Sequence, residues 1–186
     1  MKILKISGVL ALLIGLASTS FAQKFITKNG HTSFYSEAPM ENIEAHNKEV
    51  LSIIDFDSHE IVTTMLMNGF QFKKSLMQEH FNEKYVESDQ YPKATFKGKF
   101  TPNDAIDLNK DGNYELAVTG DLTIHGVTKP IETKATIEVK NGVVIGKTNF
   151  NVKVKDFDIT IPKVVVENIA ETVLVTSDFT YSPYNN

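Results

Sequence analysis

Hydrophobic and polar residues alternate along most of the second half of the chain. The alternation runs through residues 94–100, 114–124 and 131–139, and further extended segments follow at 143–155 and 171–181. Because successive side chains of a strand point to opposite faces, each alternating segment predicts a strand with one apolar and one polar face. Asn141-Gly142 separates two of the segments and is typical of a tight hairpin turn. This half of the chain therefore predicts an antiparallel sheet.

The first half of the chain contains further extended segments. Residues 24–37 read as two short extended pieces around Asn29-Gly30, which predicts a hairpin. Residues 48–57 and 60–67 are β-branched or apolar at nearly every position and predict a second hairpin, buried on more than one side. The polar segment 38–48 is expected to connect the two hairpins.

One segment has helical spacing instead. Between residues 73 and 86 an apolar stripe recurs every three or four positions, through Leu76, Met77, His80, Phe81 and Tyr85. Together with the strands, this helix predicts an all-β fold of eight or more antiparallel strands with one inserted short helix. A barrel or a sandwich would suit this count, and the length of the strands favours the barrel. Gly98 and Gly120, on the apolar faces, are expected to let the sheet bend or to make room beside a ligand.

The first 22 residues are expected to be a secretory signal peptide rather than part of the fold. Lys2 and Lys5 precede an apolar run at residues 9–16, and Ser20-Phe21-Ala22 forms a cleavage signal, which predicts cleavage after Ala22. The apolar run is shorter than the roughly 20 residues that span a bilayer, so no permanent membrane anchor is expected. A periplasmic or secreted protein is the expected product.

Composition narrows the class of the remaining chain. Removing 22 of the 186 residues leaves 164, which suits a single domain over residues 23–186. The chain has no cysteine, so disulfides and thiolate metal sites are excluded. It also has no arginine, and its formal charge of −4 becomes −6 when two lysines leave with the signal peptide. Mild acidity without a basic cluster argues against nucleic acid as a partner.

The segment Gly120–Ile131, GDLTIHGVTKPI, resembles the YceI-like family. The hallmark of that family is a strand ending in Leu-Thr-Ile-His-Gly-Val-Thr-Lys-Pro that runs directly into the next strand, and Leu122 to Pro130 match it. A second resemblance lies in Glu79–Gly98, where the family carries a Phe-rich helix followed by a Tyr-Pro-x-Ala-x-Phe start of a strand. The likeness covers most of residues 48–181. Many members follow the first strand with a Gly-x-Phe element, whereas this chain has Ile43-Glu44-Ala45-His46-Asn47. A difference in the mouth of the barrel or in the choice of ligand is therefore expected.

The resemblance implies a lipocalin-like, eight-stranded barrel that holds a long isoprenoid, an isoprenoid quinone or a similar lipid in its interior. An eight-stranded barrel is wide enough either to fill itself with side chains or to hold one slender ligand. The residues expected to line the interior collectively, with plain core packing as the alternative for each, are Phe96, Phe100, Val118, Gly120, Leu122, Ile124, Val173, Val175 and Phe179. No cofactor other than such a lipid is expected, and a homodimer remains open.

His125 is the most conspicuous polar residue of the motif. Placed before Gly126 at a turn, it is expected to fix the bend, and a contact with a ligand headgroup at the mouth is the alternative. Strand alternation puts it on the face opposite the lining residues, unless the turn rotates it. Asp121 shares its face, so a catalytic pair is a third alternative.

Two patterns suggest metal sites only weakly. Residues 107–115 place oxygen ligands as the first half of a calcium loop does, but Val118 stands where the bidentate glutamate belongs, so a hairpin loop is expected. His31, His46, His59 and His80 show no ligand spacing with one another. No metal site, nucleophile triad or nucleotide-binding motif is therefore predicted.

The leading hypothesis is an exported, non-enzymatic protein that sequesters or carries a long apolar ligand. One alternative is an enzyme acting on a lipophilic substrate, with His125 and Asp121 near the mouth. Another is a filled barrel that binds a protein partner on its outer surface.

Overall fold

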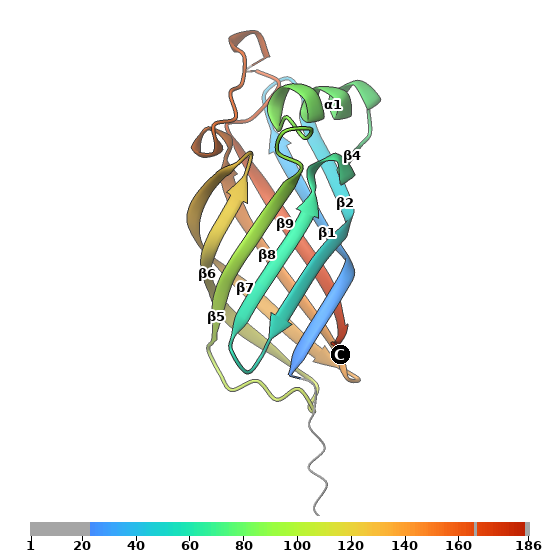
Figure 1. Ribbon diagram of the computed structural model, residues 1–186, viewed down its shortest axis with the longest axis vertical. Coiled ribbons are helices and arrows are strands. Elements are labelled where there is room, and N and C mark those ends of the chain that lie inside the picture. The colour runs from blue at the N-terminus through green and yellow to red at the C-terminus, as the bar shows by residue number, and fades with distance from the viewer. Residues whose placement is uncertain (1–22, 166, 185–186) are drawn as a thin grey trace, which may run out of the picture.

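Eight long antiparallel strands close into a barrel, as the sequence predicts (Figure 1). The computed structural model describes residues 23–165 and 167–184, so the predicted signal peptide lies outside the described residues. Around the barrel the strands follow the order β1-β9-β8-β7-β6-β5-β3-β2, and β2 pairs with β1 again. This last pairing runs from Lys24 with Asp55 to Glu37 with Asn42 and closes the ring.

Most of the strands are long, and short helical segments lie in the connections between some of them. They are β1 Lys24–Glu37, β2 Asn42–Asp55, β3 Glu60–Leu66, β4 Gln71–Phe72, β5 Lys93–Pro102, β6 Gly112–Ile124, β7 Val127–Lys140, β8 Val143–Lys153 and β9 Thr172–Pro183. The predicted helix is present as α1 Ser75–His80, continued by the π-helical turn η2 Phe81–Tyr85. The short 3-10 turns are η1 Met67–Gly69, η3 Val154–Phe157 and η4 Lys163–Val165.

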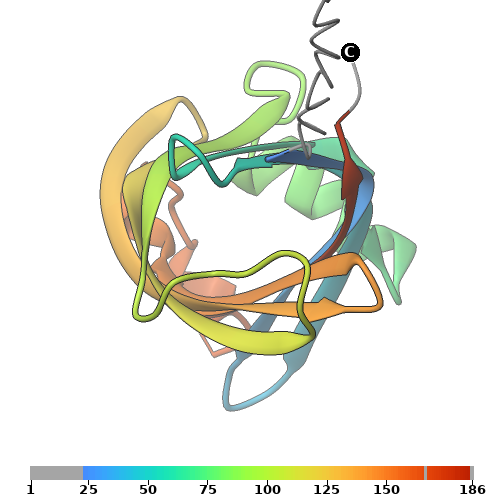
Figure 2. The same ribbon diagram turned by 90° about the horizontal axis from the view of Figure 1, so that it is seen from below.

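The two ends of the barrel differ. We call the end covered by α1, η2 and residues 154–165 and 167–170 the helix end (Figure 1). The opposite, loop end carries the loop 103–111, which crosses beneath the barrel in the view from below (Figure 2). Among the described residues, no helix is both long and apolar enough to cross a membrane.

Two tight turns fix the register of β6, β7 and β8. Both residues of His125-Gly126 have positive φ, 51° and 73°, and Asn141-Gly142 has 51° and 76°. These backbone angles give the twist that suits a two-residue hairpin, which is why Gly stands at the second position of each. The hairpin predicted at Asn141-Gly142 is confirmed.

The hairpin predicted at Asn29-Gly30 is wrong. Residues 24–37 form the single strand β1, whose pairing with both neighbours only shifts register near Gly30. A Cβ atom at Gly30 would lie 2.5 Å from the ring of Phe179. This glycine therefore makes room for an aromatic side chain instead of forming a turn.

The connection predicted at 38–48 is also shorter than expected. β2 begins at Asn42, so only residues 38–41 connect it to β1. Its inward positions include Asn47, which is fully buried and donates from Nδ2 to the carbonyl oxygen of Leu66 at 2.9 Å. Because this buried, hydrogen-bonded residue is polar, the hydrophobic pattern of the sequence did not predict a strand in this half of β2.

The predicted faces of β5, β6 and β7 are confirmed. Leu116, Val118 and Leu122 of β6 are buried, whereas Ala117, Thr119 and Asp121 are exposed. Gly98 of β5 pairs with Gly120 of β6, and a Cβ atom on either glycine would lie less than 3 Å from the ring of Phe96. The glycine pair thus provides the space in which that ring lies across the inner wall.

β7 and β8 pair only over part of their length. Their ladder runs from Lys140 with Val143 to Ala135 with Thr148, and beyond that point toward the helix end the two strands separate. The η3 turn packs there, with Phe157 buried beside Leu122 and Val152. A segment outside the sheet therefore completes the wall.

Substituting Gly98 by Ala is expected to destabilise the barrel. The new Cβ atom would lie 2.4 Å from the carbonyl oxygen of Thr119, and such overpacking costs about 1 to 3 kcal/mol. Urea denaturation of Gly98→Ala, with Lys99→Ala on the exposed face as control, measures the change in the free energy of unfolding. Equal unfolding midpoints for the two variants would show that the close approach at Gly98 is unimportant.

Candidate functional site

A cavity of about 530 Å³ occupies the interior of the barrel. This volume lies within the roughly 300 to 1,000 Å³ typical of pockets for small molecules. Every strand except β4 contributes inward side chains along its length, and most of them are aliphatic or aromatic. At the helix end the cavity is also bordered by β4, the helix α1 and several residues of the connection from β8 to β9, namely Val154, Ile159, Ile161, Val165, Asn168 and Ile169. The interior is thus hollow and mostly apolar.

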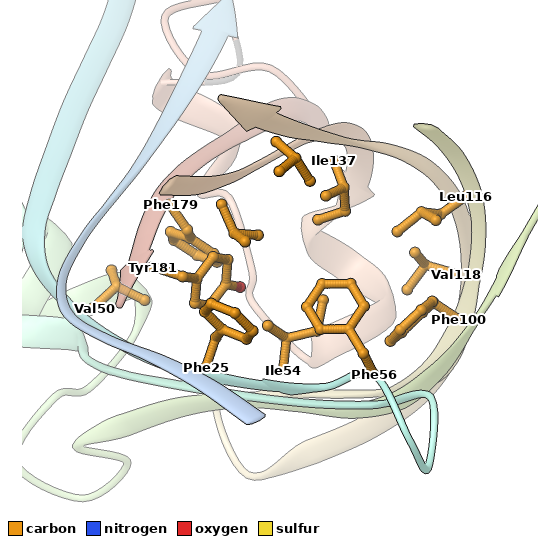
Figure 3. Close-up of a cluster of buried hydrophobic side chains, with 12 residues drawn as sticks. Phe25, Val50, Ile54, Phe56, Phe100, Leu116, Val118, Ile137, Phe179 and Tyr181 are labelled. Atoms are coloured by element: carbon orange, nitrogen blue, oxygen red, sulfur yellow. The ribbon is translucent and has the colours of Figure 1, made fainter. Parts of the chain in front are cut away.

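A cluster of buried hydrophobic side chains, several of them aromatic, points into the barrel toward the loop end (Figure 3). Phe56 packs edge-on against Phe25 and Phe100, with ring centroids 5.7 and 5.6 Å apart. Ile106 and Leu108 of the loop 103–111 pack against the same cluster. The base of the barrel is therefore a solid hydrophobic core.

Four phenylalanines form the roof of the cavity beneath α1. Phe34 of β1 lies 5.4 to 5.8 Å, between ring centroids, from the rings of Phe70, Phe72 and Phe81. All four border the cavity. Apart from Phe81, which belongs to the predicted helical stripe, the sequence did not single these residues out, because they come from separate segments of the chain.

Most of the predicted lining residues do face the cavity. Those that border it are Phe96, Val118, Leu122, Ile124, Val173, Val175 and Phe179. Phe100 instead belongs to the core at the loop end, where it is only 2% exposed. Gly120 does not border the cavity, and its role is to make room for the ring of Phe96.

The buried hydroxyl groups of the interior bond to one another. Thr32 Oγ1 and Ser177 Oγ are 2.9 Å apart, and Ser52 Oγ lies 2.9 Å from both Thr63 Oγ1 and Tyr181 Oη. Burial raises the pKa of Tyr181 well above its usual range, so its phenol stays neutral. Such pairing lowers the free-energy cost of placing polar groups in an apolar interior.

His125 fastens three segments together at the helix end. Its Nδ1 lies 3.1 Å from the carbonyl oxygen of Phe157, and its Nε2 lies 2.8 Å from Oε2 of Glu87. Both partners are acceptors, so the ring bonds both of them when each nitrogen carries a proton. Tyr91 packs edge-on against the ring, with centroids 4.4 Å apart. The β6–β7 turn, the η3 segment and the chain after η2 are thereby joined.

This geometry goes beyond the role predicted for His125 as a residue that fixes its own turn. The side chain does not border the cavity, and it makes no hydrogen bond with Asp121, which is exposed. Gly126 supports the arrangement, because a Cβ atom there would lie 2.7 Å from the ring of Tyr91. The motif that carries the family resemblance thus holds in place η3 and the chain after η2, two of the segments that cover the helix end; we call the segments at this end the cover of the barrel.

The structure also brings together two histidines whose spacing gave no signal. His31 Nε2 and His46 Nδ1 are 3.0 Å apart across the β1–β2 ladder, and the two rings stack. Burial, and next the neighbouring His46, lower the pKa of His31. Within residues 23–165 and 167–184, no group of three His, Asp or Glu side chains could hold a metal ion. In the loop 103–111, Asp107 Oδ1 accepts from the backbone N–H of Asn109, as in an ordinary Asx turn.

Comparison with known proteins gives consistent matches. A family model described as "YceI-like domain" matches residues 20–181. A UPF0312 protein of Vibrio parahaemolyticus is 45% identical over 51 residues, which are 27% of this chain and 23% of that protein. The protein YceI of Shigella flexneri is 40% identical over 53 residues, 28% of this chain and 24% of its own length. The matched segment spans about a quarter of these relatives.

Solved structures share the fold. A polyisoprenoid binding domain from Saccharophagus degradans, implicated in plant cell wall breakdown, aligns with a TM-score of 0.72 at 14% identity, covering 88% of this chain and 99% of that chain. BcnA of Burkholderia cenocepacia aligns with a TM-score of 0.68 at 16% identity, covering 82% and 96%. At such identities the likeness concerns the fold alone.

Replacing His125 by Asn is expected to loosen the cover of the barrel. Asn tolerates the positive φ of the turn but loses the contacts with Glu87 and Phe157, so the free energy of unfolding should fall by about 1 to 3 kcal/mol. Amide hydrogen exchange should accelerate in residues 155–158. The matched control is His59→Asn, at an exposed turn residue that also has positive φ. Equal exchange in both variants would contradict a fastening role.

Proposed function

The chain belongs to the YceI-like domain family, and on this premise we propose that it is an exported protein that sequesters or carries one long apolar lipid inside its barrel. The observation that carries the proposal is the cavity of about 530 Å³, closed by an aromatic core at one end and roofed by phenylalanines at the other. A polyisoprenoid or an isoprenoid quinone has the slender, apolar shape that such a cavity accommodates.

The energetics favour a long chain. Burying hydrocarbon contributes about 0.8 kcal/mol per CH₂, so two or three isoprene units supply on the order of 8 to 12 kcal/mol. Association costs about 4 to 15 kcal/mol, which a short chain would barely offset. Tight binding therefore requires several more isoprene units.

The arrangement of polar groups supports binding rather than catalysis. The ring of His125, the predicted candidate for a catalytic role, is engaged by Glu87 and Phe157. Among the described residues, no hydroxyl that borders the cavity has a hydrogen bond to a histidine or a carboxylate that could activate it. We therefore infer a carrier or storage role without turnover.

The hollow interior also argues against a filled barrel that acts only through its outer surface. That alternative requires inward side chains to occupy the space in which the cavity lies. Export is supported by the charged, apolar and small-residue pattern of residues 1–22, which suits a periplasmic or secreted carrier.

Filling the cavity should abolish lipid carriage without affecting the fold. Ala135 borders the cavity, whereas Ala117 lies on the exposed face of β6, so Ala135→Phe and Ala117→Phe add the same ring inside and outside the barrel. Native mass spectrometry with lipid extraction, on protein purified from its host, should find lipid in the wild type and in Ala117→Phe. Ala135→Phe should retain about a tenth or less. A wild-type protein that is consistently empty, or equal lipid in both variants, would disprove the proposal.

A further inference from the structure

One side of the cavity wall carries a concentration of buried hydroxyl groups. Four neighbouring strands supply them: β1, β2, β3 and β9. The residues are Thr32, Ser52, Thr63, Ser177 and Tyr181, none of which is more than 7% exposed. All except Ser52 border the cavity. The phenolic oxygen of Tyr181 points into the barrel (Figure 3).

In this wall the hydroxyl groups carry more protons than their mutual hydrogen bonds use. Tyr181, Ser52 and Thr63 form a chain of three hydroxyls joined by two hydrogen bonds. Each hydroxyl carries one proton, so two bonds use two protons and the third remains. Among the described residues, these three hydroxyls have no further hydrogen-bond partner. When the bonds run in one direction along the chain, the remaining proton is at Tyr181 or at Thr63, and both face the cavity.

The threonines of the opposite wall behave differently. Thr133 Oγ1 donates to the carbonyl oxygen of Asn149 at 3.1 Å, and Thr148 Oγ1 donates to that of Lys134 at 2.8 Å. Their protons are taken up by the backbone, so they offer no donor to a ligand. These two threonines therefore differ from the hydroxyl chain at Tyr181, which keeps a spare proton.

No charged group accompanies these donors. Among the described residues, the carboxylate, imidazole and ammonium groups that border the cavity belong to Glu41 and His80 at the helix end, and to Lys147, whose ammonium group lies 3.6 Å from Asp178. Burial raises the pKa of Tyr181, so the phenol donates as a neutral group. A phosphate placed beside it would be a buried charge without a counter-charge, which is strongly unfavourable.

We propose that Tyr181, Ser52 and Thr63 form a recognition site for a neutral hydrogen-bond acceptor at the inner end of the ligand, such as the carbonyl oxygen of a prenylated quinone. The polar end of the ligand then lies deep in the barrel, and its apolar chain extends toward the phenylalanine roof. This inference rests on the proposed lipid-carrying function and specifies the class and the orientation of the lipid.

A competition between two lipids tests the site. The protein is incubated with phosphatidylcholine vesicles that contain equal amounts of squalene and of a prenylated quinone with the same number of isoprene units. After the protein is re-isolated, the bound lipids are extracted and quantified by mass spectrometry. Because one buried, neutral hydrogen bond is gained, the wild type should take up the quinone about three- to tenfold in preference to squalene.

Variants locate the source of that preference. Tyr181→Phe combined with Thr63→Val removes both hydroxyls that face the cavity while keeping its volume, so the ratio of quinone to squalene should fall to about one as squalene uptake persists. Thr133→Val, on the opposite wall, should keep the wild-type ratio. Persistent squalene uptake also shows that the double variant is folded.

Two results would overturn the site while leaving the proposed function intact: equal uptake of both lipids by the wild type, or a preference that survives in the double variant. Uptake of neither lipid by the wild type would overturn the proposed function itself, and the site with it.

Discussion

The width of a closed eight-stranded barrel is fixed by its strands, so the sizes of its inward side chains decide whether it is solid or hollow. Here both outcomes occur in one molecule. Near the loop end, Phe25, Phe56 and Phe100 pack in one buried cluster with Val139 and Val144 of the facing strands. Farther along, small inward side chains such as Ala135 border the cavity. Every other feature of the candidate site depends on this change from large to small side chains along the barrel axis.

A hollow barrel also needs a cover, and here the cover is attached by polar contacts. η3 packs where β7 and β8 separate, and α1 with η2 lies over the phenylalanine roof. His125 joins these pieces, because its two ring nitrogens reach the chain on either side of it. The side chain that identifies the family thus contributes to the lipid site indirectly, by positioning the segments that enclose it.

The sequence predicted the barrel well where local pattern and tertiary structure agree. Alternation identified the inward faces of β5, β6 and β7, and the helical stripe located α1 with η2. The prediction failed where a residue is determined by a contact with another residue that is distant in the sequence. Asn29-Gly30 has the sequence of a turn, but Gly30 lies in a strand and makes room for Phe179. Asn47 is polar, which suggests exposure, but it is buried and donates a hydrogen bond to Leu66.

The candidate site was predictable only in part, for the same reason. Alternation shows which side of a strand is apolar, and so it found most of the lining. It does not show how far along the barrel an inward residue lies, so Phe100 was grouped with the lining although it belongs to the base. The hydroxyl chain joins Ser52, Thr63 and Tyr181, which lie far apart in sequence, and only barrel closure brings them together.

The presence of a lipid in the barrel is tested most directly by a crystal structure of the protein purified from its native host without detergent. We expect continuous, elongated electron density that extends from the phenylalanine roof to the hydroxyl of Tyr181. A cavity that contains only separate water molecules, or one that is filled by rearranged side chains, would contradict a lipid-carrying role.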